Sequence, residues 1–210
     1  MRRVESGEVK ADRSNGETRR RLLEAACRVF ARYGFQSTPV KRIVHEAGIA
    51  KPTLYYYFGD KNELYREVVL DCFNHLCQRL REANLQGPSQ LHRAECLIRH
   101  FANLVTEMPD RLVVLFNAWY APPRSADRVR GLDELRFKLV ELISSLLTPG
   151  EGEGSWRGVD PLCAAELVMG TMAQLIWHLL LHEPRSCPSN LVRGLARALT
   201  CSWNGMKMEG

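Results

Sequence analysis

The sequence predicts an all-α protein with two domains. Across the 210 residues, apolar side chains recur every three to four positions in long segments, which places them on one face of a helix. Gly and Pro residues separate these segments, and no stretch shows the apolar–polar alternation of a half-buried strand. Hydrophobic residues make up 45% of the chain, enough to build a core and too much for a disordered protein. We expect about nine helices, divided between a small domain at residues 14–62 and a larger domain at residues 63–210.

The first helix is expected from about Gly16 to Tyr33. Ser14 and Glu17 have the spacing of a capping box, in which each side chain bonds the backbone of the other residue, and Gly34 can end the helix. Its apolar stripe consists of Leu22, Ala26, Val29, Phe30 and Tyr33. This helix is expected to hold the two that follow it at a fixed angle.

Residues 38–61 contain two short helical patterns joined by a glycine. Thr38 can N-cap the first helix, at residues 40–47, with Pro39 in its first turn. Gly48 suits the left-handed conformation that ends a helix, because glycine enters that region without a steric penalty. The pattern therefore predicts a helix-turn-helix unit.

The second short helix, residues 52–58, leaves an unusual set of side chains for solvent. Leu54 and Phe58 form its apolar face, so the remaining side chains point mostly away from the core. They are Lys51, Pro52, Thr53, Tyr55, Tyr56 and Tyr57. A cation, a small hydroxyl and three phenols suit a DNA groove, where they can contact phosphates and base edges. The alternative, that a tyrosine packs within the small domain, is strongest for Tyr57.

Positive charge is concentrated in the first part of the chain. Residues 1–62 hold 13 Lys and Arg against 7 Asp and Glu, a net charge of +6, which leaves 16 against 17 for residues 63–210. Such an imbalance is typical of a phosphate-binding surface. Residues 1–13 lack periodicity, and we expect a flexible basic arm there, which either follows the DNA or is simply disordered.

The run GIAKPTLYYYFGDKNEL, residues 48–64, resembles the recognition-helix region of the TetR/AcrR family of bacterial transcription regulators. The resemblance covers roughly residues 17–65 and implies a DNA-binding domain, a C-terminal effector domain, a homodimer and a palindromic operator in double-stranded DNA. By this resemblance, the residues that face DNA are Thr38, Lys41, Lys51, Pro52, Thr53, Tyr55, Tyr56, Tyr57 and Lys61. One departure is Ala50, which stands where many relatives have a Ser or Thr that caps the recognition helix.

The fourth helix, residues 61–84, is expected to link the two domains mechanically, because it begins in the first and extends well into the second. Asp60 and Glu63 again have the spacing of a capping box. Proline and glycine breaks then separate further helices, at residues 89–107, 109–120, 126–147, 161–182 and 190–203. The segment 149–158 has the composition of a loop.

Residues 162–181 are long enough to span a membrane. Glu166, Gln174 and His178 interrupt the segment, so we interpret it as a helix buried in a core or at a subunit interface. It is apolar nearly all round, and by resemblance it pairs with the last helix to form the dimer interface; burial within one protomer is the alternative. The predicted interface residues are Leu167, Gly170, Ala173, Leu175, His178, Leu195 and Leu199.

An effector pocket is expected in the C-terminal domain, because the resemblance implies one between its helices. Aromatic and methionine side chains with a few polar groups suit a fair-sized apolar ligand, although they would fill an ordinary core equally well. The predicted lining consists of His100, Phe101, Met108, Phe116, Trp119, Tyr120, Met169, Met172, Gln174 and Trp177. Because this half has no charge excess, a strongly charged ligand is not indicated.

The cysteines and histidines of the chain show no pattern that indicates a metal site or a catalytic site. Seven cysteines, an odd number without a CxxC motif, predict reduced core thiols in a cytoplasmic protein. His178 and His182 lie one turn apart but lack further metal ligands at recognised spacing. The chain carries no phosphate-binding glycine loop and no nucleophile elbow. We therefore expect no catalytic residue, no enzyme activity, no metal and no cofactor.

Together these patterns predict a DNA-binding transcription regulator, most simply a repressor that leaves its operator when a small hydrophobic effector binds. Two alternatives stay open on the same scaffold. One is a redox sensor that uses Cys187, the cysteine expected to be exposed. The other is a small enzyme or ligand carrier, which would bind DNA weakly and without specificity.

Overall fold

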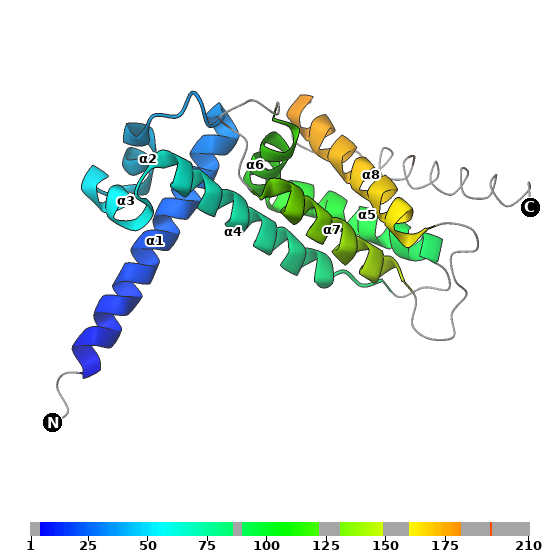
Figure 1. Ribbon diagram of the computed structural model, residues 1–210, viewed down its shortest axis with the longest axis horizontal. Coiled ribbons are helices and arrows are strands. Elements are labelled where there is room, and N and C mark those ends of the chain that lie inside the picture. Colours follow the sequence, from blue (N-terminus) through cyan, green and yellow to red (C-terminus); the bar gives the residue numbers. More distant parts are fainter. Residues whose placement is uncertain (1–4, 86–89, 122–130, 149–159, 182–193, 195–210) are drawn as a thin grey trace, which may run out of the picture.

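The computed structural model describes residues 5–85, 90–121, 131–148, 160–181 and residue 194. Throughout these residues the regular structure is α-helical, which confirms the predicted fold class (Figure 1). The eight helices are α1 (Glu5–Tyr33), α2 (Val40–Ala47), α3 (Lys51–Phe58), α4 (Lys61–Arg81), α5 (Gln90–Glu107), α6 (Pro109–Tyr120), α7 (Leu132–Leu147) and α8 (Pro161–Leu181). The ninth predicted helix, residues 190–203, lies outside the described residues.

The helices form two groups that share α4. In Figure 1, α1, α2 and α3 lie together at one end, α5 to α8 form a bundle at the other, and α4 runs from the first group along the second. The first half of α1 projects away from both groups. Its second half packs against α2, α4 and α6, so that α1 contacts both groups. None of the helices described is both long enough and apolar enough to cross a bilayer.

The first helix starts earlier than predicted. It begins at Glu5, so Ser14 and Glu17 lie inside α1 and do not cap its start, and most of the predicted arm is helical. The helix continues through Gly16, because a glycine inside a helix costs only about 1 kcal/mol relative to alanine. The interior Asn15 also accepts a hydrogen bond from the Tyr57 hydroxyl of α3, which supports the helix at this point.

The predicted caps have mixed outcomes. Asp60 caps α4 as expected, its carboxylate accepting from the backbone N–H groups of Asn62 at 2.7 Å and Glu63 at 2.9 Å. The Glu63 side chain does not complete the box, because it pairs with Arg66. The cap predicted from Thr38 is wrong, since α2 starts after Pro39 without a side-chain cap.

The buried Thr38 instead supports the turn before α2. Its hydroxyl donates to the Gly34 carbonyl at 2.7 Å, and its backbone N–H donates to the Phe35 carbonyl. The Gly34 oxygen lies at the end of α1, where carbonyl groups have no partner within the helix. Both polar donors of Thr38 are therefore used inside the protein.

Two arginines of α1 contact the C-terminal end of α2. Gly48 ends α2 in the predicted left-handed conformation, with φ of 62°. Arg21 donates to the Ala47 carbonyl at 2.9 Å, which satisfies an acceptor that the helix end leaves open. Arg28 pairs with Glu46 at 3.0 Å. The Arg21 hydrogen bond therefore adds to the packing of α1 against the end of α2, whereas the exposed Arg28–Glu46 pair contributes little.

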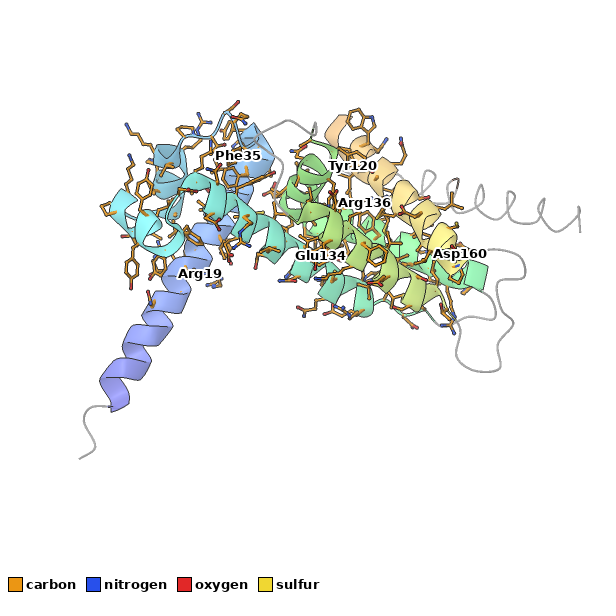
Figure 2. All side chains as sticks on the ribbon, in the orientation of Figure 1. Arg19, Phe35, Tyr120, Glu134, Arg136 and Asp160 are labelled. Carbon is orange, nitrogen blue, oxygen red and sulfur yellow. The ribbon has the colours of Figure 1, made fainter. Side chains whose placement is uncertain are left out.

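The contact of α1 with α4 is mostly apolar and has an ion pair at its edge. Phe30 meets the ring of Tyr65 edge-on at 5.0 Å between centroids, and Cys27 and Cys72 bring their sulfurs to 3.6 Å. Arg19 of α1 pairs with Glu67 of α4 at 2.6 Å where the two helices meet (Figure 2). Because these contacts are mostly buried, α4 should follow any movement of α1.

We predict that Asp60→Ala lowers the free energy of unfolding by about 1 kcal/mol, because two backbone N–H groups at the start of α4 lose their acceptor. Chemical denaturation measures this loss as a lower midpoint at an unchanged slope. The control is Asn74→Ala, at an exposed position in the middle of the same helix, where a change within about 0.5 kcal/mol is expected. Equal stability of the Asp60 variant and the wild type would contradict the capping role.

Candidate nucleic-acid interface and internal cavity

The α3 helix has one buried side and one exposed side, as predicted. Leu54 and Phe58 are buried in the core of the N-terminal group. Tyr56 is 77% exposed and Tyr55 is 41% exposed. Large aromatic side chains at such exposure contribute little to the protein's own core, so this surface is available to another molecule.

The tyrosines of α3 differ in how they are held. Tyr56 and Tyr57 meet edge-on, with ring centroids 5.2 Å apart, and the ammonium of Lys51 lies 5.7 Å from the Tyr55 ring. Tyr57 is half-buried and donates to Asn15 of α1. Tyr57 therefore belongs partly to the packing between helices, as the alternative interpretation of this residue suggested.

The start of α3 has no side-chain cap. Ala50 takes the N-cap position in an extended conformation, and Pro52 lies in the first turn. The backbone N–H groups of a first helical turn have no partner inside their own helix and carry partial positive charge. Together with the exposed Lys51, this helix end favours a negatively charged group such as phosphate.

The other predicted DNA-facing residues lie around α3 in different environments. Lys41 and Pro52 are exposed and Thr53 is half-buried. Lys61 is half-buried at the start of α4, with its ammonium 4.2 Å from the Phe35 ring centroid. Thr38, in contrast, is buried with its hydroxyl turned inward, so its side chain does not belong to the exposed surface.

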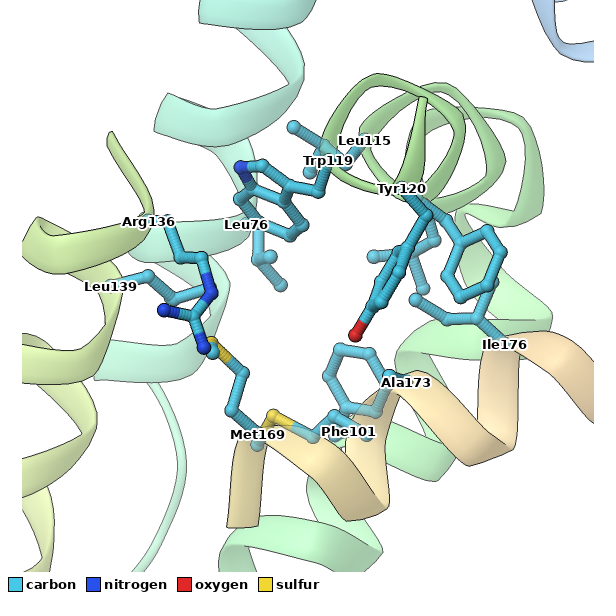
Figure 3. A pocket seen from close by; sticks show the side chains of 13 residues that line it. Leu76, Phe101, Leu115, Trp119, Tyr120, Arg136, Leu139, Met169, Ala173 and Ile176 are labelled. Atoms are coloured by element: carbon cyan, nitrogen blue, oxygen red, sulfur yellow. The ribbon is translucent and has the colours of Figure 1, made fainter. Parts of the chain in front are cut away.

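A cavity of about 130 Å³ lies within the C-terminal group (Figure 3). It is lined by Leu76, Phe101, Leu112, Leu115, Phe116, Trp119, Tyr120, Arg136, Leu139, Met169, Met172, Ala173 and Ile176, which come from α4 to α8. Most of these side chains are aliphatic, aromatic or thioether groups. The cavity thus favours an apolar ligand or an apolar part of one.

Six of the ten predicted lining residues do line this cavity: Phe101, Phe116, Trp119, Tyr120, Met169 and Met172. The other four do not. His100 contacts the Arg79 carbonyl through Nε2 at 2.8 Å, and Met108 is buried just before α6. Gln174 is exposed, and the ring of Trp177 packs against Phe116 with 5.9 Å between centroids.

The aliphatic residues of the lining and Arg136 were not among the predicted ones. Leucines such as Leu76 and Leu139 carry no signal that separates a cavity wall from a filled core. Arg136 was missed because a charged residue on an amphipathic helix is normally assigned to the solvent face. Ala173, predicted for the dimer interface, also lines the cavity.

The other predicted interface residues of α8 divide between surface and core. Leu167 is 50% exposed, and Gly170 is exposed as well. His178 is half-buried, whereas Leu175 is fully buried in the protomer, so Leu175 packs the core of its own chain. Leu195 and Leu199 lie outside the described residues.

Four of the five cysteines within the described residues, Cys27, Cys72, Cys77 and Cys163, give no support to a redox site. Cys27, Cys72 and Cys77 are buried, and the contact with Cys27 together with burial raises the pKa of the Cys72 thiol. The exposed Cys163 has a raised pKa because its thiol donates to the Asp160 carboxylate. A raised pKa disfavours the reactive thiolate. Cys187 lies outside the described residues, which also contain no group of three His, Cys, Asp or Glu side chains placed to hold a metal ion.

Known proteins resemble both the sequence and the fold. Residues 22–68 match the family described as bacterial regulatory proteins, tetR family. The chain is 30% identical over 147 residues to an uncharacterized HTH-type transcriptional regulator of Bacillus subtilis, YfiR, covering 67% of this chain and 69% of the relative. It is 27% identical over 149 residues to the HTH-type transcriptional repressor KstR2 of Rhodococcus jostii, covering 70% and 72%.

The fold also matches a solved structure. The transcriptional regulator FadR from Bacillus subtilis, in complex with stearoyl-CoA, superposes with a TM-score of 0.69 at 19% identity, covering 85% of this chain and 96% of FadR. This coverage extends over far more of the chain than the family match at residues 22–68, which is centred on the helix-turn-helix unit. The helix-turn-helix geometry, the exposed α3 surface and these relatives agree, and the protein belongs to the TetR family of bacterial transcription regulators.

Proposed function

We propose that the protein is a homodimeric repressor that binds a palindromic operator through α3 and leaves it when a small, largely hydrophobic effector enters the cavity. The observation that carries this proposal is the exposure of Lys51, Tyr55 and Tyr56 on α3, within the part of the chain that holds a net charge of +6. The repressor role is supported by the similarity to KstR2.

The proposed DNA contacts follow from exposure. Tyr55 and Tyr56 reach base edges or phosphates, together with Lys51, Pro52 and Thr53 at the start of the helix. Lys41 and Lys61 contact phosphates on either side. Thr38 and Tyr57 act mainly by holding the turn and α3 in place, because their polar groups are already bonded inside the protein.

The proposed dimer uses the outer face of α8, with the last predicted helix. Leu167 supplies exposed apolar surface, and Gly170 permits a close approach of backbones. A two-fold axis would place two α3 helices about one DNA turn apart, roughly 34 Å. Such an arrangement reads a palindrome and works in the cytoplasm, where the chromosome is.

The effector would act on α3 through α4 and α6. Leu76 of α4 and five residues of α6 line the cavity, while α4 and α6 both pack against α1. Arg111 of α6 also pairs with Asp71 of α4. A ligand that prefers a different spacing of these helices would favour a different spacing of the two α3 helices.

The cavity limits the ligand that fits without rearrangement. An engineered apolar cavity of about 150 Å³ holds a benzene molecule, so about 130 Å³ accepts only a short alkyl or aryl group. A longer chain requires α4, α6 or α8 to move apart, and that movement is the proposed signal. FadR, which shares the fold, was solved in complex with stearoyl-CoA.

This proposal assigns the chain no catalytic reaction. The relatives that it matches are named as transcription regulators. An enzyme or ligand carrier on the same scaffold would turn over or bind its ligand independently of α3, so the variants below separate the two.

We predict that Tyr56→Ala weakens specific operator binding by on the order of a hundredfold or more, since removing a base or phosphate contact costs about 1–3 kcal/mol in each of two subunits. The unfolding free energy should stay within about 0.5 kcal/mol of the wild type, because the side chain is exposed. Fluorescence anisotropy with the DNA upstream of the gene measures the affinity.

Tyr56→Phe serves as the matched variant, since it keeps the ring and removes the hydroxyl. An intermediate loss is expected if the hydroxyl donates to DNA. If Tyr56→Ala binds the operator as tightly as the wild type, α3 is not the DNA-binding helix.

We predict that Lys51→Gln reduces the salt dependence of DNA binding. The substitution removes one phosphate contact from each subunit of the dimer, which should lower the slope of log K against log salt concentration by about 2, at about 0.9 per phosphate. Lys138→Gln, an exposed lysine of α7 paired with Glu134, is the control and should leave the slope unchanged. Equal slopes in both variants would remove Lys51 from the phosphate-binding residues.

A further inference from the structure

One charged side chain lines the otherwise apolar cavity. Among its described lining residues, Arg136 of α7 is the only one that carries a charge. Figure 3 shows Arg136 and Tyr120 reaching toward the cavity from opposite sides, with Met169 of α8 near the arginine. The side chains of Leu76, Leu112 and Leu115 on its walls are almost fully buried. The buried walls of the cavity are therefore mostly apolar, and its polar groups are those of Arg136 and Tyr120 together with the indole N–H of Trp119, which is buried without a hydrogen-bond partner.

The present partner of Arg136 is a carboxylate on the next helix. Its guanidinium lies 2.6 Å from Glu166 of α8. The two side chains remain 48% and 44% exposed. An ion pair with this exposure contributes little net stability, because water and salt screen both charges. Exchanging Glu166 for another anion at the same guanidinium would therefore cost the protein little.

The guanidinium matches the oxygens of an anion in geometry as well as in charge. Its planar fork can donate two parallel hydrogen bonds to a carboxylate or phosphate. The exposed Tyr120 hydroxyl, on the opposite side, can donate a further one. The leucines of the buried walls offer no such donor from their side chains. A ligand with one anionic end and one apolar end thus satisfies both parts of the cavity.

We propose that the effector is an anionic amphipath. Its alkyl part occupies the cavity, and its anionic oxygens replace Glu166 as the ion-pair partner of Arg136. This inference rests on the proposed function and specifies its ligand class. It revises the expectation, drawn from charge balance, that a charged ligand is not indicated, because one well-placed cation does not alter the net charge of a domain. Glu166 acts as the competitor, so a neutral ligand of the same length leaves the α7–α8 ion pair intact.

The same helix offers a matched control. Lys138 of α7 also forms an exposed ion pair, with Glu134 at 2.7 Å, but that pair lies within one helix and neither residue lines the cavity. If Arg136 were an ordinary surface ion pair, the two positions would behave alike. The ligand response of Arg136→Gln compared with Lys138→Gln therefore isolates the role of the cavity.

The test is isothermal titration calorimetry of the full-length protein with octanoate, 1-octanol and octanoyl-CoA. The wild type should bind octanoate about tenfold more tightly than 1-octanol, since a hydrogen bond from the guanidinium to a carboxylate is stronger than one to a neutral hydroxyl. Arg136→Gln should abolish this preference, and Glu166→Gln should increase the octanoate affinity severalfold. Lys138→Gln should match the wild type, and circular dichroism confirms that each variant is folded.

The arms of the test separate the sources of the anion. A loss of octanoate binding in Arg136→Gln indicates a free carboxylate, and a loss confined to octanoyl-CoA indicates phosphate oxygens of the nucleotide; either supports the proposal. If Arg136→Gln binds both octanoate and octanoyl-CoA as tightly as the wild type does, or if the wild type binds all three ligands equally, the proposal is overturned.

Operator release, measured with the same ligands, distinguishes this inference from the proposed function. If 1-octanol releases the DNA as well as octanoate does, the effector function stands and the anionic ligand class falls. If no ligand in the series binds or releases DNA, both proposals fail.

Discussion

The structure depends on the packing of α1 against α4, because these two helices belong to both parts of the molecule. The buried part of this contact consists of the Phe30 and Tyr65 rings and the sulfurs of Cys27 and Cys72. An ion pair between Arg19 and Glu67 lies at its edge. The polar contacts of Arg21 and Arg28 then attach α2 and its turn to the same α1. These contacts position α2 and α3 relative to α1 and α4, so we expect a displacement of α1 and α4 to move α3 with them.

The two functional surfaces lie on either side of this contact. On one side, α3 contributes only two residues to the core and leaves Tyr55, Tyr56 and Lys51 exposed. On the other, Leu76 of α4 forms part of the cavity wall, and α6, which supplies much of the rest, packs directly on α1. A ligand therefore contacts elements that are one packing layer from the helix-turn-helix. In the proposed mechanism, a shift of α4 or α6 would reach α1 without rearrangement of the whole bundle.

Sequence reasoning succeeded where one residue had one favourable role. Gly48 ends α2 because its conformation requires glycine, and Asp60 caps α4 because its carboxylate has two backbone donors within reach. Predictions were wrong where one hydroxyl had two possible acceptors, or where contacts between distant segments determine a helix start or a side-chain position. Thr38 could bond forward to α2 or back to Gly34, and burial selects the second. Likewise α1 continues through Gly16, although local propensity favours a helix start there. Arg136 lines the cavity because α7 packs against α8 and the other helices around it, which the local sequence does not encode.

The central claim is that the cavity and α3 are coupled through α1, α4 and α6. The most direct measurement is a closed set of four titrations: DNA into protein with the cavity empty and saturated by a cavity ligand, and that ligand into protein with and without DNA. The account predicts that the ligand weakens DNA binding by a factor between about 5 and 150, and that DNA weakens ligand binding by the same factor. A ligand that occupies the cavity and leaves the affinity for DNA unchanged would contradict it.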